Sequence, residues 1–358
     1  MIALAGMVRD SANDLDSNRQ STPLLVFQHN SFREECFKET GSLNRGRHDL
    51  KAGIEADSIS LHERFDYRIT NPSYFDPGTP PTFTFADQRP DLGQGAFVED
   101  LFRAGNWTVR AGLRWDHYQL VVNKNAFSPR VSVGRYVPSW NAVLHASFDR
   151  IFQTPSFENI LFSSSPQTDV LSPQFLHLPV RPSMGSYFES GVSKGLSNHA
   201  RLDANVYSRD ARNFADDDQL LNTGLSYPIA FDKGVIYGAE SKLSVVRWGR
   251  LHGYASYSYM VGNVWFPVMG GLFLGDDVNT AVTQLRGHSP NSQDQRNTFR
   301  TRLQYQLTPR KWIAAGAEYG SGLPFEYQGT EAEAVAQYGA RMINRLNFER
   351  DRDDQICL

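Results

Sequence analysis

The segment 140–149 carries the three side-chain types of a hydrolytic triad. His145, Ser147 and Asp149 occupy alternate positions there, and alternate positions of a β-strand share one face. Residues two apart on a strand lie about 7 Å from each other, which is too far for a nucleophile and its base to share a proton. We therefore interpret the three residues as polar positions on one strand face, and not as a catalytic site.

The run Asp216–Asp218 is a candidate cation site, but its spacing differs from that of a calcium-binding loop. Leu220 stands at a ligand position, and no Gly or Glu follows at the required places. We interpret the run as a solvated acidic loop. The two cysteines, Cys36 and Cys357, build neither a disulfide framework nor a zinc site, and no phosphate-binding loop or nucleotide fingerprint is found. The sequence predicts no enzyme, no metal site and no cofactor.

Five arginines share one property: each lies in a segment where polar and apolar residues alternate. They are Arg110, Arg114, Arg130, Arg300 and Arg302. In a barrel the polar face of such strands lines the lumen, where arginines could contact another domain or line a solute path. The alternative is that they only pair with neighbouring carboxylates such as Asp116 and Asp203, and for any single arginine we favour this alternative.

Alternation also defines the elements that position these side chains. From Trp107 to Trp115, apolar residues take every second place, which indicates a strand with one apolar and one charged face. The same pattern recurs in 140–149, 201–206, 250–259 and 299–307. The alternating segments run for about 9 to 14 residues, whereas a soluble strand has about 5 or 6 and a strand tilted across a bilayer needs about 9 to 11.

Short and long connections alternate along the chain. The short ones contain Gly, Pro or Asn, which favour tight turns, and lie at 104–106, 137–139, 195–198, 248–249, 308–310 and near 41–46. Longer links lie at 71–93, 152–185, 213–234, 261–293 and 320–340, and only the link near 121–127 is short on that side. This sorting is typical of a transmembrane barrel. We predict an all-β, antiparallel up-and-down barrel with about 12 strands and a thirteenth beginning near Arg341.

The composition agrees with this class. Of 358 residues, 40% are hydrophobic and 12% aromatic, which excludes a disordered or collagen-like chain. No stretch approaches the roughly 18 to 20 unbroken apolar residues of a spanning helix. The net charge of -3 gives no general attraction to nucleic acid, so no nucleic-acid partner is predicted.

Short motifs occur in a fixed order over roughly residues 90 to 350. They are Phe97–Asp100 followed by Gly112–Asp116, then Ser128–Arg130, Ile151–Ser156, Gly238–Glu240, Asp294–Thr298 and Gly320–Phe325. In this order the chain resembles the barrel of TonB-dependent outer-membrane receptors, where a Ser-Pro-Arg strand start is commonly followed by a strand that ends in an aromatic residue and a Pro-Ser step.

The resemblance implies a transport receptor in the cell outer membrane of a Gram-negative type of cell, in contact with outer-membrane lipid. Such a receptor binds a small nutrient ligand, for example an iron chelate, a cofactor or a glycan, at its outer loops and passes it through the lumen. Two further partners are implied: a plug domain inside the barrel and the TonB complex, which supplies energy.

The resemblance also sets expectations for the extent of the chain. Receptor barrels of this kind have roughly 22 strands, so about 12 make an incomplete barrel, which we place in residues 21–350. We expect residues 1–20 to be an irregular segment without a visible signal peptide, and the charged stretch 351–358 to be an aberrant tail. The chain is therefore expected to be a receptor fragment that is inactive alone.

Two alternatives stay open. A plugless outer-membrane barrel, such as a porin or an adhesin, shares all of the strand evidence. A soluble β-rich carbohydrate-binding protein is the second, because half-exposed soluble sheets also alternate. Such a protein needs no detergent, which separates it from both barrels.

Overall fold

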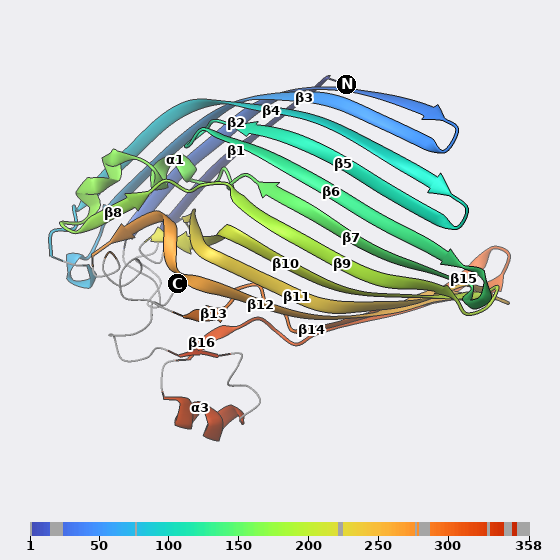
Figure 1. Cartoon of the computed structure of the whole chain (residues 1–358). Coiled ribbons are helices and arrows are strands. Elements are labelled where there is room, and N and C mark those ends of the chain that lie inside the picture. The colour runs from blue at the N-terminus through green and yellow to red at the C-terminus, as the bar shows by residue number, and fades with distance from the viewer. Residues whose placement is uncertain are drawn as a thin grey trace.

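The computed structural model describes residues 2–14, 24–75, 77–220, 225–275, 278, 287–327, 330–339 and 346–348. Most of them form one antiparallel sheet in which consecutive strands lie side by side (Figure 1). Its main path consists of β1 (Ile2–Asp14), β2 (Leu24–Arg45), β3 (His48–Ile69), β4 (Thr82–Ala104), β5 (Trp107–Tyr118), β6 (Lys124–Val137), β7 (Ala142–Gln153), β9 (Ser183–Gly195), β10 (Ala200–Gln219), β11 (Ser226–Trp248), β12 (Leu251–Leu274), β14 (Asn297–Thr308) and β15 (Lys311–Gly320). The short strands β8 (Phe175–Leu178) and β13 (His288–Pro290) pair with β12.

The sheet curves strongly but does not close, because β1 and β15 do not pair within the part of the chain that the structure describes (Figure 1). The predicted all-β, antiparallel and incomplete barrel is confirmed. Strand β1 lies where the sequence predicts an irregular segment. It pairs with β2 from Ile2 opposite Phe37 to Asp14 opposite Leu25, so backbone hydrogen bonding places a strand that no side-chain alternation marks.

The short turns gather at one rim of the sheet, as predicted (Figure 1). Two-residue turns join Arg45 to His48 and Ala104 to Trp107. Gly46 and Gly105 have φ of 64° and 56° in these turns, a left-handed conformation that only glycine adopts without strain. We call this end of the sheet the turn rim and the opposite end the outer rim.

The predicted long loops are wrong over much of their length, because strands occupy them. β4 begins at Thr82, within the expected loop 71–93, and β12 continues to Leu274, within 261–293. The run Asp216–Asp218 is paired with β11 and belongs to strand β10, not to a loop. These strands are much longer than the about 9 to 11 residues that a tilted strand needs to cross a bilayer.

We call the link between β7 and β9, residues 154–182, the strap. It contains α1 (Ile160–Ser163), the 3-10 helix η3 (Pro166–Leu171) and β8. Helix α1 contacts both β4 and β11, which five other strands separate in the sheet. A short segment can reach two such distant strands only on the hollow side, so the strap lies within the concave face (Figure 1). The main apolar core lies there, at the outer rim.

The convex face carries apolar residues near the turn rim and polar residues farther out. On β3 the convex positions Leu50, Ala52 and Ile54 are followed by His62 and Arg64. Large apolar side chains remain exposed on this face across many strands, among them Leu43, Val98, Leu113, Val131, Val206, Leu303 and Ile313. An exposed apolar band of this kind is the surface that a transmembrane barrel presents to lipid.

Leu303 tests the assignment of the two faces. Its side chain is 47% exposed on the convex face of β14, and Gln304 beside it points to the concave face. We expect Leu303→Arg to destabilise the membrane-inserted protein by about 2–4 kcal/mol, because the charge enters lipid near the middle of the span. Gln304→Arg is the matched control and is expected to cost much less. Urea titration of the protein in lipid vesicles measures both, and equal losses would show that the faces are wrongly assigned.

The C-terminal part of the described chain leaves the main sheet. β16 (Phe325–Tyr327) and β17 (Leu346–Phe348) form a separate parallel pair, and α3 (Glu331–Tyr338) lies between them in sequence. The expected start of a thirteenth strand near Arg341 and the expected tail 351–358 fall outside the described residues. None of the described helices is both long and apolar enough to cross a membrane.

Candidate functional site

The concave face carries the five predicted arginines, alternating with the apolar residues of the convex face. Arg110 and Arg114 lie on β5, Arg130 on β6, and Arg300 and Arg302 on β14. The first three lie close together, because Gly112 on β5 is paired with Arg130. Alternation thus places the side chains on one face, and the strand register decides which of them meet.

Arg114 is the centre of an ion-pair network near the middle of the face. Its Nη2 donates to Glu55 Oε1 on β3 at 2.6 Å and lies 2.7 Å from Asp116 Oδ1 on its own strand. Glu55 also accepts from Lys38 Nζ on β2 at 2.9 Å. The network therefore ties β2, β3 and β5 together through side chains.

Gly95 on β4 makes this network possible. It is paired with Glu55 on one side and Asp116 on the other, so it lies directly between β3 and β5. A Cβ atom at this position would lie 2.7 Å from Arg114 Nη2, so the guanidinium would have to move from its present place. The absence of a side chain on β4 allows the arginine to reach across it.

The remaining arginines divide into paired and unpaired ones. Arg300 pairs with Glu318 on β15 at 2.6 Å, so both Arg114 and Arg300 pair with neighbouring carboxylates. Asp203 pairs with Arg201 instead of with any of the five. Within the described ranges, three of the five make no ion pair: Arg110, Arg130 and Arg302.

Two of the unpaired arginines line a shallow cavity of about 280 Å³ on the concave face. Arg110 and Arg130 lie there with Lys51 and with one carboxylate, Glu99. Because positive side chains outnumber negative ones, this part of the face can attract anionic groups of a solute or of another domain. The role of the five arginines in lining a lumen remains a prediction.

The three residues with triad chemistry do not form a triad. His145 Nε2 lies 3.5 Å from Glu189 Oε1 on β9, and Tyr187 donates to the other oxygen of Glu189 at 2.7 Å. In the described part of the chain, no hydrogen bond joins His145 to Ser147 or Asp149. The residues share the concave face, as the alternation predicts.

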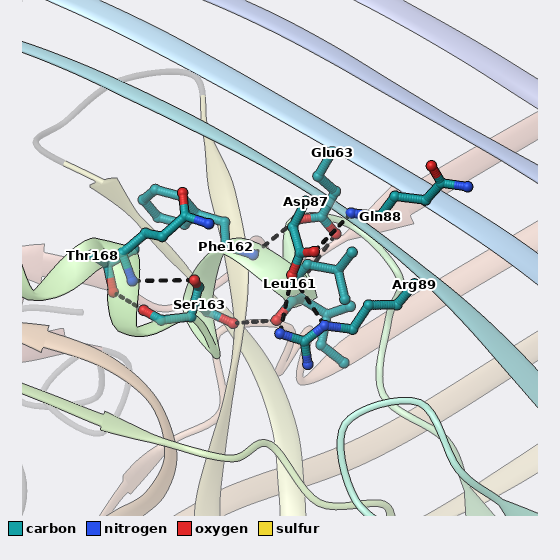
Figure 2. Close-up of polar contacts among 11 residues, drawn as sticks. Glu63, Asp87, Gln88, Arg89, Leu161, Phe162, Ser163 and Thr168 are labelled. Atoms are coloured by element: carbon teal, nitrogen blue, oxygen red, sulfur yellow. Dashed lines mark hydrogen bonds and ion pairs between the residues drawn. The ribbon is translucent and has the colours of Figure 1, made fainter.

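Sequence analysis missed a second polar site, at the outer rim under the strap. The Glu63 side chain on β3 is 3% exposed and accepts hydrogen bonds from the backbone N–H groups of Leu161 at 3.2 Å and Phe162 at 2.9 Å (Figure 2). A signal for it exists in the sequence, because Glu63 interrupts an alternate apolar series that includes Leu61 and Phe65. Glu63 is the sixteenth residue of β3 from the turn rim and so lies beyond the roughly 9 to 11 residues that cross a bilayer.

Burial raises the pKa of Glu63 to about 8. The hydrogen bonds from the α1 backbone favour the charged carboxylate and oppose this rise, but desolvation is the larger effect. The negative charge of Asp87 on β4 raises the pKa further. Asp87 is itself paired with Arg89, 3.0 Å away on the same strand (Figure 2).

Asn159 supplies the second polar contact of the strap. Its Oδ1 accepts from Gln28 Nε2 at 2.7 Å and from Asn30 Nδ2 at 2.9 Å, both on β2. Its Nδ2 donates to the backbone oxygen of Ser226 on β11 at 2.6 Å. Asn159 has φ of 55°, a left-handed conformation that asparagine tolerates better than most residues. One side chain thus joins two distant strands of the sheet.

A curved antiparallel meander with an apolar convex band and a charged concave face is the architecture of an outer-membrane barrel wall. Residues 8–348 match the family described as TonB dependent receptor-like, beta-barrel. The chain belongs to this family, as its motifs predict.

Solved structures have the same fold at low sequence identity. The copper transporter OprC has a TM-score of 0.58 and 14% identity, with 88% of this chain and 47% of that chain covered. The siderophore receptor PiuA from Acinetobacter baumannii has a TM-score of 0.57 and 14% identity, with coverages of 89% and 51%. The ferripyoverdine receptor of Pseudomonas aeruginosa has a TM-score of 0.57 and 12% identity, with coverages of 88% and 43%. The chain spans about half the length of these structures. Comparison with curated protein sequences finds no match.

Proposed function

We propose that this chain is part of the barrel wall of an outer-membrane receptor that takes up a scarce nutrient with energy from the TonB complex. The main support for this proposal is the family match over residues 8–348. The exposed apolar band of the convex face and the charged concave face agree with it. The concave face would line the solute path and contact a plug domain. We assign the chain no enzymatic role, because the family to which it belongs is one of receptor barrels.

The class of nutrient is proposed from the neighbours and from the charge of the concave face. The names of the similar structures specify copper, a siderophore and ferripyoverdine. An iron chelate is therefore the first candidate, ahead of a cofactor or a glycan. Chelates that carry negative charge would be attracted to the unpaired Arg110 and Arg130.

The open sheet supports the further proposal that the chain is a fragment and inactive alone. β1 and β15 each leave one edge unpaired within the described residues, and an unpaired backbone group in lipid costs several kcal/mol. Additional strands must close the wall before a solute can be separated from lipid. The half-length coverage of the similar structures agrees with this requirement.

Two measurements test the proposed function. Membrane fractionation should recover the chain in the outer-membrane fraction, from which only detergent releases it; release without detergent would indicate the soluble carbohydrate-binding alternative. Uptake of a labelled iron chelate by cells that produce the complete receptor containing this chain should disappear when TonB is deleted. Uptake that persists without TonB would contradict the proposal and favour a plugless barrel.

A further inference from the structure

The strap is attached to the sheet in two different ways. Its C-terminal half is joined by backbone hydrogen bonds, because β8 pairs with β12 and Gly275 N donates to Gln174 O at 2.8 Å. Its N-terminal half, residues 154–171, is here called the cap. Within the described chain, the cap makes backbone-to-backbone hydrogen bonds only within itself.

The cap is held to the sheet by apolar packing and by two buried polar contacts. Ile160, Leu161 and Phe162 of α1 are fully buried within the concave face, between the wall that contains β3 and β4 and the opposite wall that contains β11. The polar contacts are those of Glu63 with the α1 backbone and of Asn159 with β2 and β11. Both of these contacts pass through a side chain, and neither is a backbone-to-backbone hydrogen bond.

Phe162 is the centre of the packing. Its ring meets Phe65 edge-on at 5.5 Å and Phe85 at 5.4 Å between ring centroids. Phe83 and Tyr227 complete its surroundings, each at 6.3 Å. These partners come from β3, β4 and β11, so the ring occupies the space between opposite walls of the sheet.

We propose that the cap is a hinged cover over the outer end of the concave face, kept closed by the buried side chains of Glu63 and Asn159, and that it opens as a unit while the strands stay paired. The difference in attachment carries the proposal: strands are fixed by continuous backbone ladders, but the cap is fixed by side chains. The covering of a solute path rests on the proposed function, whereas the separate opening of the cap does not.

Hydrogen-exchange mass spectrometry on the full chain in detergent micelles tests the separate opening. In the unmodified protein, amides of residues 160–165 should exchange at lower urea concentrations than amides of β3 and β11, which report the sheet. Simultaneous exchange of the cap and these strands would overturn the proposal, because the cap would then be an inseparable part of the core.

Two variants test the polar contacts. Asn159→Gly removes the side chain without disturbing the left-handed backbone, and Glu63→Ala removes the acceptor of two amides. Each should accelerate exchange of residues 160–165 by roughly tenfold or more, since unpaired buried polar groups are costly, while β5 and β6 keep their protection. Val170→Ala, at an exposed position of the cap, is the matched control and should leave exchange unchanged. Unaltered exchange in both variants, or equal acceleration in β5 and β6, would refute the role of these contacts.

These experiments separate the cap from the proposed function. If uptake persists without TonB but the cap exchanges before the strands, the separate opening of the cap stands and its role over a solute path is removed. If uptake depends on TonB but the cap and the strands exchange together, the proposed function stands and the separate opening of the cap is refuted.

Discussion

Phe162→Ala is expected to lower the free energy of cap opening by about 3–5 kcal/mol, the usual cost of removing a buried aromatic ring. The ring is fully buried and surrounded by four aromatic side chains from three strands. Neither wall can move inward to fill the space, because each is fixed by its own hydrogen-bond ladder. Exchange of residues 160–165, converted to a free energy of opening, measures the loss.

Phe175→Ala is the matched control for this substitution. Phe175 begins β8 in the same strap, but its side chain is 41% exposed. The same change of residue type should therefore cost much less. If Phe175→Ala lowers the free energy of cap opening as much as Phe162→Ala, the strap depends on general hydrophobicity and not on the packing of the Phe162 ring between the two walls.

The closed cap is expected to be more stable in acid than in base over the range in which Glu63 titrates. Glu63 has a pKa of about 8 in the closed state and an ordinary value of 4.5 when solvated, so closure takes up a proton between these values. The contribution is fully present below pH 4.5 and is lost as the pH rises through 8. The interval between the two values corresponds to ~5 kcal/mol at about 1.4 kcal/mol for each pH unit. Cap exchange, corrected for the chemical exchange rate at each pH, measures this dependence.

Two variants identify the group responsible. Glu63→Gln should remove the pH dependence between pH 5 and 8, because no proton is then taken up on closure. Asp87→Asn should shift the dependence to lower pH, since the charge of Asp87 raises the pKa of Glu63. A profile that is identical in all three proteins would assign the dependence to another group, such as a histidine.

The sequence predicted the phase of the strands better than their length. Alternation correctly assigns the faces of β5, β7 and β14, because side-chain direction depends only on whether a position is odd or even. The lengths fail at prolines: Pro90 lies within β4 and Pro267 within β12, although a proline usually marks a loop or an edge. Each removes one backbone donor, and the neighbouring pairs of these long ladders are enough to continue the strand.

The partners of the arginines could not be predicted, because they depend on register between strands. Arg114 and Glu55 are 59 residues apart in sequence and meet across Gly95, which the register places between them. The packing of the cap against the sheet could not be predicted for the same reason. Residues 152–185 appear in the sequence as an ordinary long link, and nothing local shows that Phe162 and Glu63 belong together.

The cap also bears on the order in which the chain folds. Each strand of the main path pairs with its neighbour along the path, so hairpins can form from contacts that are mostly close in the chain. Phe162 instead needs Phe65 and Tyr227, which come from opposite walls, and closing such long intervals costs entropy before any contact forms. The space that the Phe162 ring occupies between the two walls exists only after the sheet has acquired its curvature. Docking of the cap should therefore be a late step, and a sheet with slipped register or too little curvature would leave Phe162 exposed as a marker of misfolding.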